Sequence, residues 1–395
     1  MLSPIFLRTS AFPLIQIFAS YLLLPVLGPY FRSLGHNDAW ISLAFALFGI
    51  GYIIAGLSVG ALSDRYGRRR IISWAIMVTI LAYILYFAGF SWSILTARLL
   101  DGFCFGVLTV IGISLVEDRM KDRERGTKTG LYLTLESGTR LLAPVLGGFL
   151  ADQFIGAPFF LSILILVVLL IIQHRLIKHH KHSPIPAQSI GARLRLLFLY
   201  PRLQPLIILG FVVHTSTPVI ILFIPLFITG TLGFSYVYAG LAISLYGGSH
   251  LLQFLFGHFV DSIGRKRLVT LGCLIYGLAL LGLAQAGDNI SSVLTFVAFA
   301  GVGNSLWSVA GMSYLSNVAA EFGERERLIG AYVSIVKIGE VLSFILGGLL
   351  IVAVSEKALF LTIGLLVIGG TILSSILFIR LSRKERAALL EANGD

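Results

Sequence analysis

Long apolar runs alternate with short polar connections along the whole chain. About 20 predominantly apolar residues cross a bilayer as a helix, and twelve runs approach or exceed that length. They cover roughly 11–31, 39–62, 71–90, 93–116, 129–151, 157–174, 204–229, 237–260, 268–286, 291–318, 328–353 and 357–380. The alternation of polar and apolar residues that marks a membrane β-barrel is absent. The pattern predicts an all-α membrane protein with 12 transmembrane helices.

The composition excludes a soluble globular domain, because 57% of the residues are hydrophobic, 12% are charged and the mean hydropathy is +0.92. The basic residues that give the net charge of +11 lie mostly in the connections between the apolar runs and in the two tails. Of the 30 lysines and arginines, 25 lie in alternate connections and the two tails, whereas the opposite connections hold only Arg32 and Lys357. This distribution predicts that both termini are cytoplasmic. It also predicts contact with anionic lipids and argues against nucleic-acid binding.

The second half of the chain repeats the first. Gly60, Asp64 and Gly67 recur 197 positions later as Gly257, Asp261 and Gly264, and basic residues follow each copy. The Gly147-Gly148 pair recurs as Gly347-Gly348. Two similar bundles flanking one site are a common plan of transporters. The repeat predicts a six-helix bundle over 1–174, a cytoplasmic linker over 175–203, and a second six-helix bundle with a short cytoplasmic tail over 204–395.

The linker holds a cluster of histidines, His179, His180 and His182, with two prolines and several basic residues nearby. No cysteine or carboxylate lies beside the cluster, although such residues usually complete a metal site. We therefore interpret it as a solvated linker facing the lipid surface. No metal site is expected.

Over essentially its whole length the chain resembles the major facilitator superfamily. The stretch Gly60-x-Leu-x-Asp64-Arg65-x-Gly67-Arg68-Arg69 matches the loop signature of that family between spans two and three, and 257–266 is a weaker copy. The resemblance implies that Asp64 latches this loop onto span eleven in the outward-facing state. It leaves the arginines either pairing with cytoplasmic carboxylates or only fixing topology. The expected conformational motif comprises Gly60, Asp64, Arg65, Gly67, Arg68, Gly257, Asp261, Gly264 and Arg265.

Three further sequence patterns extend the resemblance. Arg98-Leu-Leu-Asp101-Gly102 is similar to the fourth-span motif of the family, with Asp101 in place of the usual glutamine. Ala143-Pro144-Val-Leu-Gly147-Gly148 resembles the fifth-span motif of proton-driven exporters, with Ala143 in the first glycine position. The first span is similar to that of the drug:proton antiporter branch at Pro25, Pro29 and Gly35. The resemblance implies a helix-packing role for Pro144, Gly147 and Gly148.

Six ionisable residues lie inside the predicted spans, where charges are costly and usually mark pathways. They form three sequence-adjacent pairs: Arg98 with Asp101, Glu136 with Arg140, and Lys337 with Glu340. Each pair is either a structural salt bridge or a site where the carboxylate changes protonation during transport. Glu136 and Asp101 are the candidate proton carriers, and the resemblance implies that Arg98 modulates them. The polar and aromatic residues His214, Asn304 and Trp307 complete the candidate cavity.

No phosphate-binding loop and no enzyme motif occur in the sequence, so we expect no ATP use, no catalytic residues and no cofactor. The prediction is a monomeric secondary transporter of the bacterial cytoplasmic (inner) membrane. It exports small amphipathic compounds by proton antiport and alternating access. One alternative is a proton-coupled or facilitated importer of a metabolite, and a less favoured one is a membrane sensor or transceptor.

Overall fold

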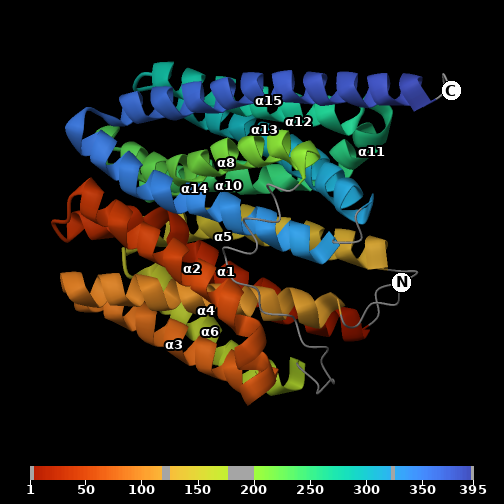
Figure 1. The fold of residues 1–395 in the computed structure, drawn as a ribbon. Helices are drawn as coiled ribbons and strands as arrows, with labels where there is room; N and C mark the ends of the chain where they lie inside the picture. Colours follow the sequence, from red (N-terminus) through yellow and green to blue (C-terminus); the bar gives the residue numbers. More distant parts are fainter. Residues whose placement is uncertain (1–3, 118–124, 177–199, 322–324, 393–395) are drawn as a thin grey trace. The chain divides into compact units, whose positions relative to one another are not determined.

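The computed structural model describes residues 4–117, 125–176, 200–321 and 325–392. Within these ranges all regular structure is helical (Figure 1). Ten of the described helices are long and apolar enough to cross a membrane, and an eleventh apolar helix, Ala157–Gln173, is shorter. The remaining long helix, Arg125–Gln153, contains Lys128, Glu136, Arg140 and Asp152. The predicted all-α membrane architecture is confirmed.

The first half of the chain contains one helix for each predicted span. These are α1 (Pro4–Ser33), α2 (Asp38–Tyr66), α3 (Arg68–Ala88), α4 (Ser91–Glu117), α5 (Arg125–Gln153) and α6 (Ala157–Leu176). The linker histidines His179, His180 and His182 lie outside the described residues.

Two spans of the second half are interrupted. The seventh contains η2 (Pro201–Leu203), α8 (Gln204–Pro218), the π-helical η3 (Val219–Phe223), α9 (Ile224–Leu226) and the π-helical η4 (Phe227–Thr231). The eighth contains α10 (Tyr236–Gly248), the 3₁₀ segment η5 (Ser249–Leu252) and α11 (Gln253–Ile263). Continuous helices follow: α12 (Arg265–Gln285), α13 (Ile290–Glu321), α14 (Arg325–Ala353) and α15 (Glu356–Ala392).

A glycine with positive φ separates two helices in each copy of the repeated loop. Gly67 has φ 81° and divides α2 from α3, while Gly264 has φ 98° and divides α11 from α12. Glycine adopts this backbone conformation without the steric cost that a Cβ atom brings. The second glycine of the repeated motif therefore makes a tight turn between the two helices in each half.

The described residues divide into two compact units. The first contains α1 to α6 together with segments 218–251 and 341–356. The second contains the described parts of 189–217, 252–340 and 357–395. This division follows packing, whereas the boundaries at 174 and 204 follow the sequence repeat and stay a prediction.

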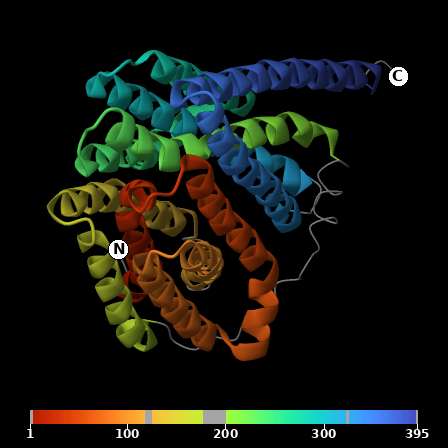
Figure 2. The same cartoon turned by 90° about the vertical axis from the view of Figure 1, so that its left-hand side faces the viewer.

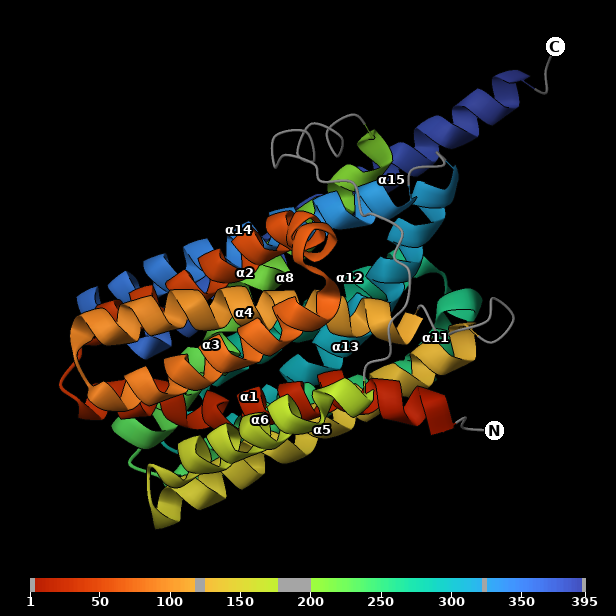
Figure 3. The same cartoon turned by 90° about the horizontal axis from the view of Figure 1, so that it is seen from below.

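Small residues allow helices within each unit to approach closely. In the first unit, α6 packs against both α1 and α3 (Figure 3), and a Cβ atom on Gly51 of α2 would lie 2.7 Å from the backbone nitrogen of Phe103 in α4. In the second unit α12 and α13 run along one another (Figure 2). A Cβ atom on Gly272 would lie 2.5 Å from the Trp307 nitrogen there. Such backbone contact is the usual basis of helix packing in membranes.

Candidate functional site

The six intramembrane charged residues form three clusters, each named for the helix that carries its ion pair. The α4 cluster consists of Arg98, Asp101 and Tyr86, and the α5 cluster of Glu136, Arg140 and Tyr21. Both lie in the first unit. The α14 cluster, in the second unit, consists of Lys337, Glu340, His214 and Trp307.

The α4 cluster is enclosed within the first unit. A nitrogen of Arg98 lies 3.4 Å from the Asp101 carboxylate, and the hydroxyl of Tyr86 donates to the same oxygen at 2.8 Å. The guanidinium carbon also lies 4.3 Å from the ring centroid of Phe45 and 4.4 Å from that of Phe48. Both charged side chains are buried, and the aromatic faces attract the cation. This geometry favours a structural salt bridge, one of the two interpretations that the sequence leaves open.

The α5 cluster is more accessible. Arg140 donates two hydrogen bonds to the same oxygen of Glu136, one of them from Nε at 3.2 Å. The side chain of Arg140 is 33% exposed and that of Glu136 is 13% exposed. The guanidinium carbon also lies 5.3 Å from the ring centroid of Tyr21 in α1. Glu136 therefore has a cationic partner that a second group holds in place from another helix.

The α14 cluster brings together residues that are far apart in the sequence. Lys337 donates to Glu340 at 2.6 Å, and His214 of α8 lies 3.6 Å from the same carboxylate oxygen. The ring of His214 meets Trp307 of α13 edge to face, with the ring centroids 5.7 Å apart. Among the described residues, the buried Trp307 indole nitrogen has no hydrogen-bond partner. Asn304 lies three residues before Trp307 on the same helix.

The charged clusters of the two halves are related through the repeat. Arg140 and Glu340 stand 200 positions apart, the same offset that relates Gly147 to Gly347. Equivalent places in α5 and α14 therefore carry opposite charges. This relation is visible in the sequence once the repeat alignment is extended through both helices.

In both halves the arginine after the turn glycine reaches a serine on a later helix. Arg68 donates to Ser114 of α4 at 2.8 Å, and Arg265 donates to Ser313 of α13 at 2.9 Å. The sequence analysis did not anticipate these serines. Arg68 therefore links α3 to α4 within the first half of the chain. A role limited to fixing the membrane topology does not include this hydrogen bond.

The structure describes the side chains of only some of the residues expected to form the latch. Asp64 and Arg65 are exposed, and Arg65 lies 5.2 Å from the ring centroid of Tyr66. The side chain of Asp261 lies outside the part of the chain that the structure describes, as do the side chains at the start of α14. The latch of Asp64 onto span eleven stays a prediction.

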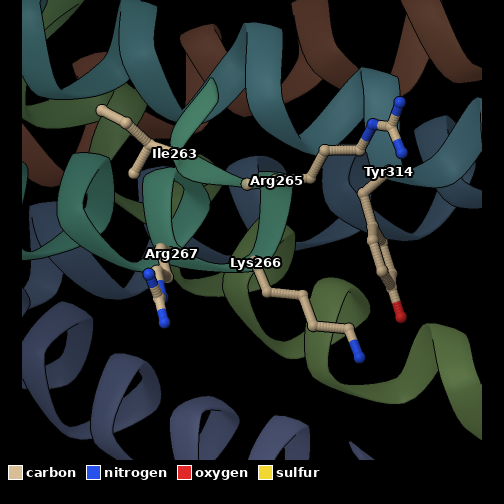
Figure 4. A pocket seen from close by; sticks show the side chains of 6 residues that line it. Ile263, Arg265, Lys266, Arg267 and Tyr314 are labelled. Atoms are coloured by element: carbon tan, nitrogen blue, oxygen red, sulfur yellow. The ribbon is translucent and has the colours of Figure 1, made fainter. Parts of the chain in front are cut away.

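The second copy of the loop borders an open pocket of about 350 Å³, lined by Ile263, Gly264, Arg265, Lys266, Arg267 and Tyr314 (Figure 4). Two of these basic residues donate hydrogen bonds to serines. Arg265 donates to Ser313 of α13, and Lys266 donates to Ser382 of α15 at 2.9 Å. The basic residues after the turn thus connect α12 to α13 and α15.

The fifth-span motif forms close contacts with two helices. A Cβ atom on Gly147 would clash with the carbonyl of Leu22 in α1, and one on Gly148 would clash with that of Tyr236 in α10. From the opposite side, a Cβ atom on Gly240 of α10 would clash with the carbonyl of Pro144. The motif therefore lies where α5, α1 and α10 touch through their backbones.

The same helices are also tied near the connections that the sequence predicts to be non-cytoplasmic. The carboxylate of Asp152 accepts from the first two backbone amides of α10, at 2.7 and 3.2 Å. Arg32 pairs with Asp38 at 2.7 Å and donates to the carbonyl of Leu226 at 2.9 Å. These contacts join helices of the first half to segments of spans seven and eight. In the sequence Arg32 counts only as a charge in a connection, and no pattern there indicates the contacts of Arg32 or Asp152.

Comparison with known proteins agrees with this architecture. The profile of the Major Facilitator Superfamily matches residues 13–250 and, in a second match, residues 206–394. The chain is 26% identical over 378 residues to a multi-drug resistance efflux pump PmrA homolog of Lactococcus lactis, covering 92% of each chain. It is 23% identical over 393 residues to quinolone resistance protein NorA of Staphylococcus aureus, covering 94% of this chain and 95% of that protein.

Solved structures show the same fold at low sequence identity. The nucleoside transporter NupG has a TM-score of 0.77 at 13% identity, covering 95% of this chain and 99% of that one. A D-xylose-proton symporter has a TM-score of 0.73 at 16% identity, covering 94% and 97%. These structures support the fold alone.

Proposed function

The chain belongs to the major facilitator superfamily of membrane transporters, and we propose that it exports small amphipathic compounds in exchange for protons. The relatives named above as an efflux pump and a quinolone resistance protein support export. The absence of a phosphate-binding loop from the sequence favours an ion gradient over ATP as the energy source. The proposal requires no bound cofactor.

The main support for proton coupling is the geometry of the α5 cluster. Glu136 is paired and mostly buried, yet its partner Arg140 is one-third exposed. Protonation of Glu136 removes its charge and weakens the pair, and the ring of Tyr21 remains over the guanidinium. Glu136 can therefore exchange its proton without leaving Arg140 isolated. We assign it the proton-carrying role and place Asp101, enclosed with Arg98 and Tyr86, in a structural role.

The α14 cluster is the proposed substrate contact in the second half. The carboxylate of Glu340 attracts cationic groups. The buried indole of Trp307 has a face suited to aromatic rings and an N–H donor with no partner among the described residues. Lys337 neutralises the charge of the Glu340 carboxylate when no substrate is bound. A planar, partly charged amphipathic compound fits this set of groups.

Alternating access would use both ends of the helices. The hydrogen bond of Arg32 to Leu226 and the cap of Asp152 on α10 would help to close the predicted outer end. The repeated loops at Asp64 and Asp261 would act at the predicted cytoplasmic end. We further propose that both termini lie in the cytoplasm and that the protein works as a monomer in the bacterial inner membrane.

Everted membrane vesicles with an imposed pH gradient test the proposal. Acid-inside vesicles that contain the protein should accumulate a fluorescent quinolone, and a protonophore should abolish the uptake. ATP depletion at a constant gradient should have no effect, and vesicles without the protein provide the control. Accumulation that ignores the protonophore would contradict proton coupling. Accumulation only in right-side-out vesicles with the opposite gradient would indicate an importer.

A further inference from the structure

A groove between three helices of the first unit lies apart from the three charged clusters. It has a volume of about 390 Å³ and is lined by Leu62, Tyr66, Arg70, Ile71, Trp74 and Phe103, among others. These residues come from α2, α3 and α4. Small-molecule sites in proteins range from about 300 to 1,000 Å³. The groove is therefore large enough for part of an amphiphile.

The groove is apolar along its length and cationic at one end. Buried Ile71 and Val107 and the ring of Phe103 provide apolar surface. Arg70 lies in the first turn of α3, and Trp74 follows it by four residues, so both occupy the same helix face about one turn apart. The cation thus lies at the loop end, and the indole lies one turn further into the span.

Arg70 is the charge best placed to receive a ligand there. Its neighbour Arg68 donates to Ser114, and Arg65 lies over Tyr66. Among the residues that the structure describes, Arg70 makes no hydrogen bond or ion pair, and its side chain is exposed. Guanidinium groups bind phosphate oxygens in a bidentate manner, and tryptophan and tyrosine favour the headgroup region of a bilayer.

We propose that this groove binds an anionic phospholipid from the leaflet that the loop faces. Arg70 holds the phosphodiester, and one acyl chain lies against Trp74, Phe103 and Ile71. The cationic end disfavours cationic amphiphiles, so the occupant differs from a positively charged transport substrate. Because the lining residues come from three helices, an occupied groove braces α2, α3 and α4 together.

Fluorescence quenching by brominated lipids tests the proposal directly. The four tryptophans are Trp40, Trp74, Trp92 and Trp307. A variant that keeps only Trp74 is reconstituted in phosphatidylcholine bilayers containing brominated phosphatidylglycerol or brominated phosphatidylcholine. We expect phosphatidylglycerol to associate at Trp74 several-fold more strongly. A variant that keeps only Trp92, which is 82% exposed in the first turn of α4 and outside the groove lining, should show no such preference.

Two substitutions on adjacent residues separate the groove from general surface charge. Arg70→Gln should bring the ratio of phosphatidylglycerol to phosphatidylcholine association at Trp74 close to one. Arg69→Gln removes an equal charge from an exposed residue that does not line the groove, so the preference should persist. If the single-tryptophan variants do not fold, native mass spectrometry of the otherwise unchanged protein should show the same loss of bound phosphatidylglycerol with Arg70→Gln only.

Three outcomes would overturn the proposal. Equal quenching of Trp74 by both lipids would show that the groove does not select the anionic headgroup. An equal loss of preference in Arg69→Gln and Arg70→Gln would show that the loop attracts anionic lipid only through its total charge. Removal of the preference by millimolar inorganic phosphate would indicate an anion site that does not need the acyl chain.

Discussion

Opposite charges at equivalent places of the repeat give the two halves different chemistry. Arg140 faces a carboxylate one turn earlier on α5, whereas Glu340 is compensated by Lys337 and approached by His214. Equivalent positions of a repeated sequence thus carry different charged groups. The proposed function uses this difference, with proton exchange in the first half and substrate contact in the second.

The substitution Glu136→Gln should abolish proton-driven transport while downhill exchange of substrate persists. The neutral amide resembles the protonated carboxyl and can still accept a hydrogen bond from Arg140, so the protein should remain in the membrane at a normal level. Transport and abundance are measured in the same vesicles. If the pair were only structural, its disruption would cost about 3–5 kcal/mol and the protein would be lost. A well-expressed variant that still pumps would exclude Glu136 from the proton path.

For Asp101→Asn we expect the opposite phenotype. The change leaves a buried guanidinium beside the rings of Phe45 and Phe48 without its anion, and removal of one partner from a buried pair costs about 3–5 kcal/mol. The melting temperature in detergent and the abundance in membranes should both fall. Tyr86→Phe, which removes only a hydrogen bond, should have a smaller effect, about 1–3 kcal/mol. Normal abundance with uncoupled transport would move the proton-carrying role to Asp101.

At the scale of helices, the contact between α5 and α10 depends on glycine. A Cβ atom at Gly148 would clash with the Tyr236 carbonyl, which belongs to the backbone and cannot rotate away. Gly148→Ala should therefore lower the melting temperature by several degrees. A Cβ atom on Gly138 of the same helix would meet no neighbouring atom within 4 Å, so Gly138→Ala should be neutral or stabilising by up to about 1 kcal/mol. Equal effects of the two substitutions would contradict a backbone contact at the fifth-span motif.

Sequence patterns predict the positions of the helices better than the side-chain contacts between them. Apolar run length locates the spans, and the repeated glycines locate the turns at Gly67 and Gly264, because both signals are local. The serines that Arg68 and Arg265 reach lie nearly 50 residues further on, and no local pattern marks them. The π-helical segments of span seven follow or precede Pro218 and Pro225. Proline lacks an amide donor, but its presence does not specify which alternative hydrogen bonding results.

Across the whole molecule, Arg32 and Asp64 occupy opposite predicted ends of the helices. The contact of Arg32 with Leu226 is present in this structure and ties α1 to span seven. The family resemblance implies that the latch of Asp64 onto span eleven forms in the outward-facing state. In alternating access the two ties would stabilise different states of one equilibrium, because a contact shifts a population only by its difference between the states.

This relation predicts that the two substitutions partly compensate. Arg32→Gln should favour opening of the predicted outer end, and Asp64→Asn should favour opening of the cytoplasmic end, so each should lower turnover without lowering abundance. The double variant should turn over faster than the product of the two single effects predicts, since the opposite shifts restore the balance of states. Turnover in proteoliposomes and labelling of a single cysteine near Ser33 measure activity and outer opening together. Effects that simply multiply, or equal labelling in all four proteins, would show that the two ties do not act on one equilibrium.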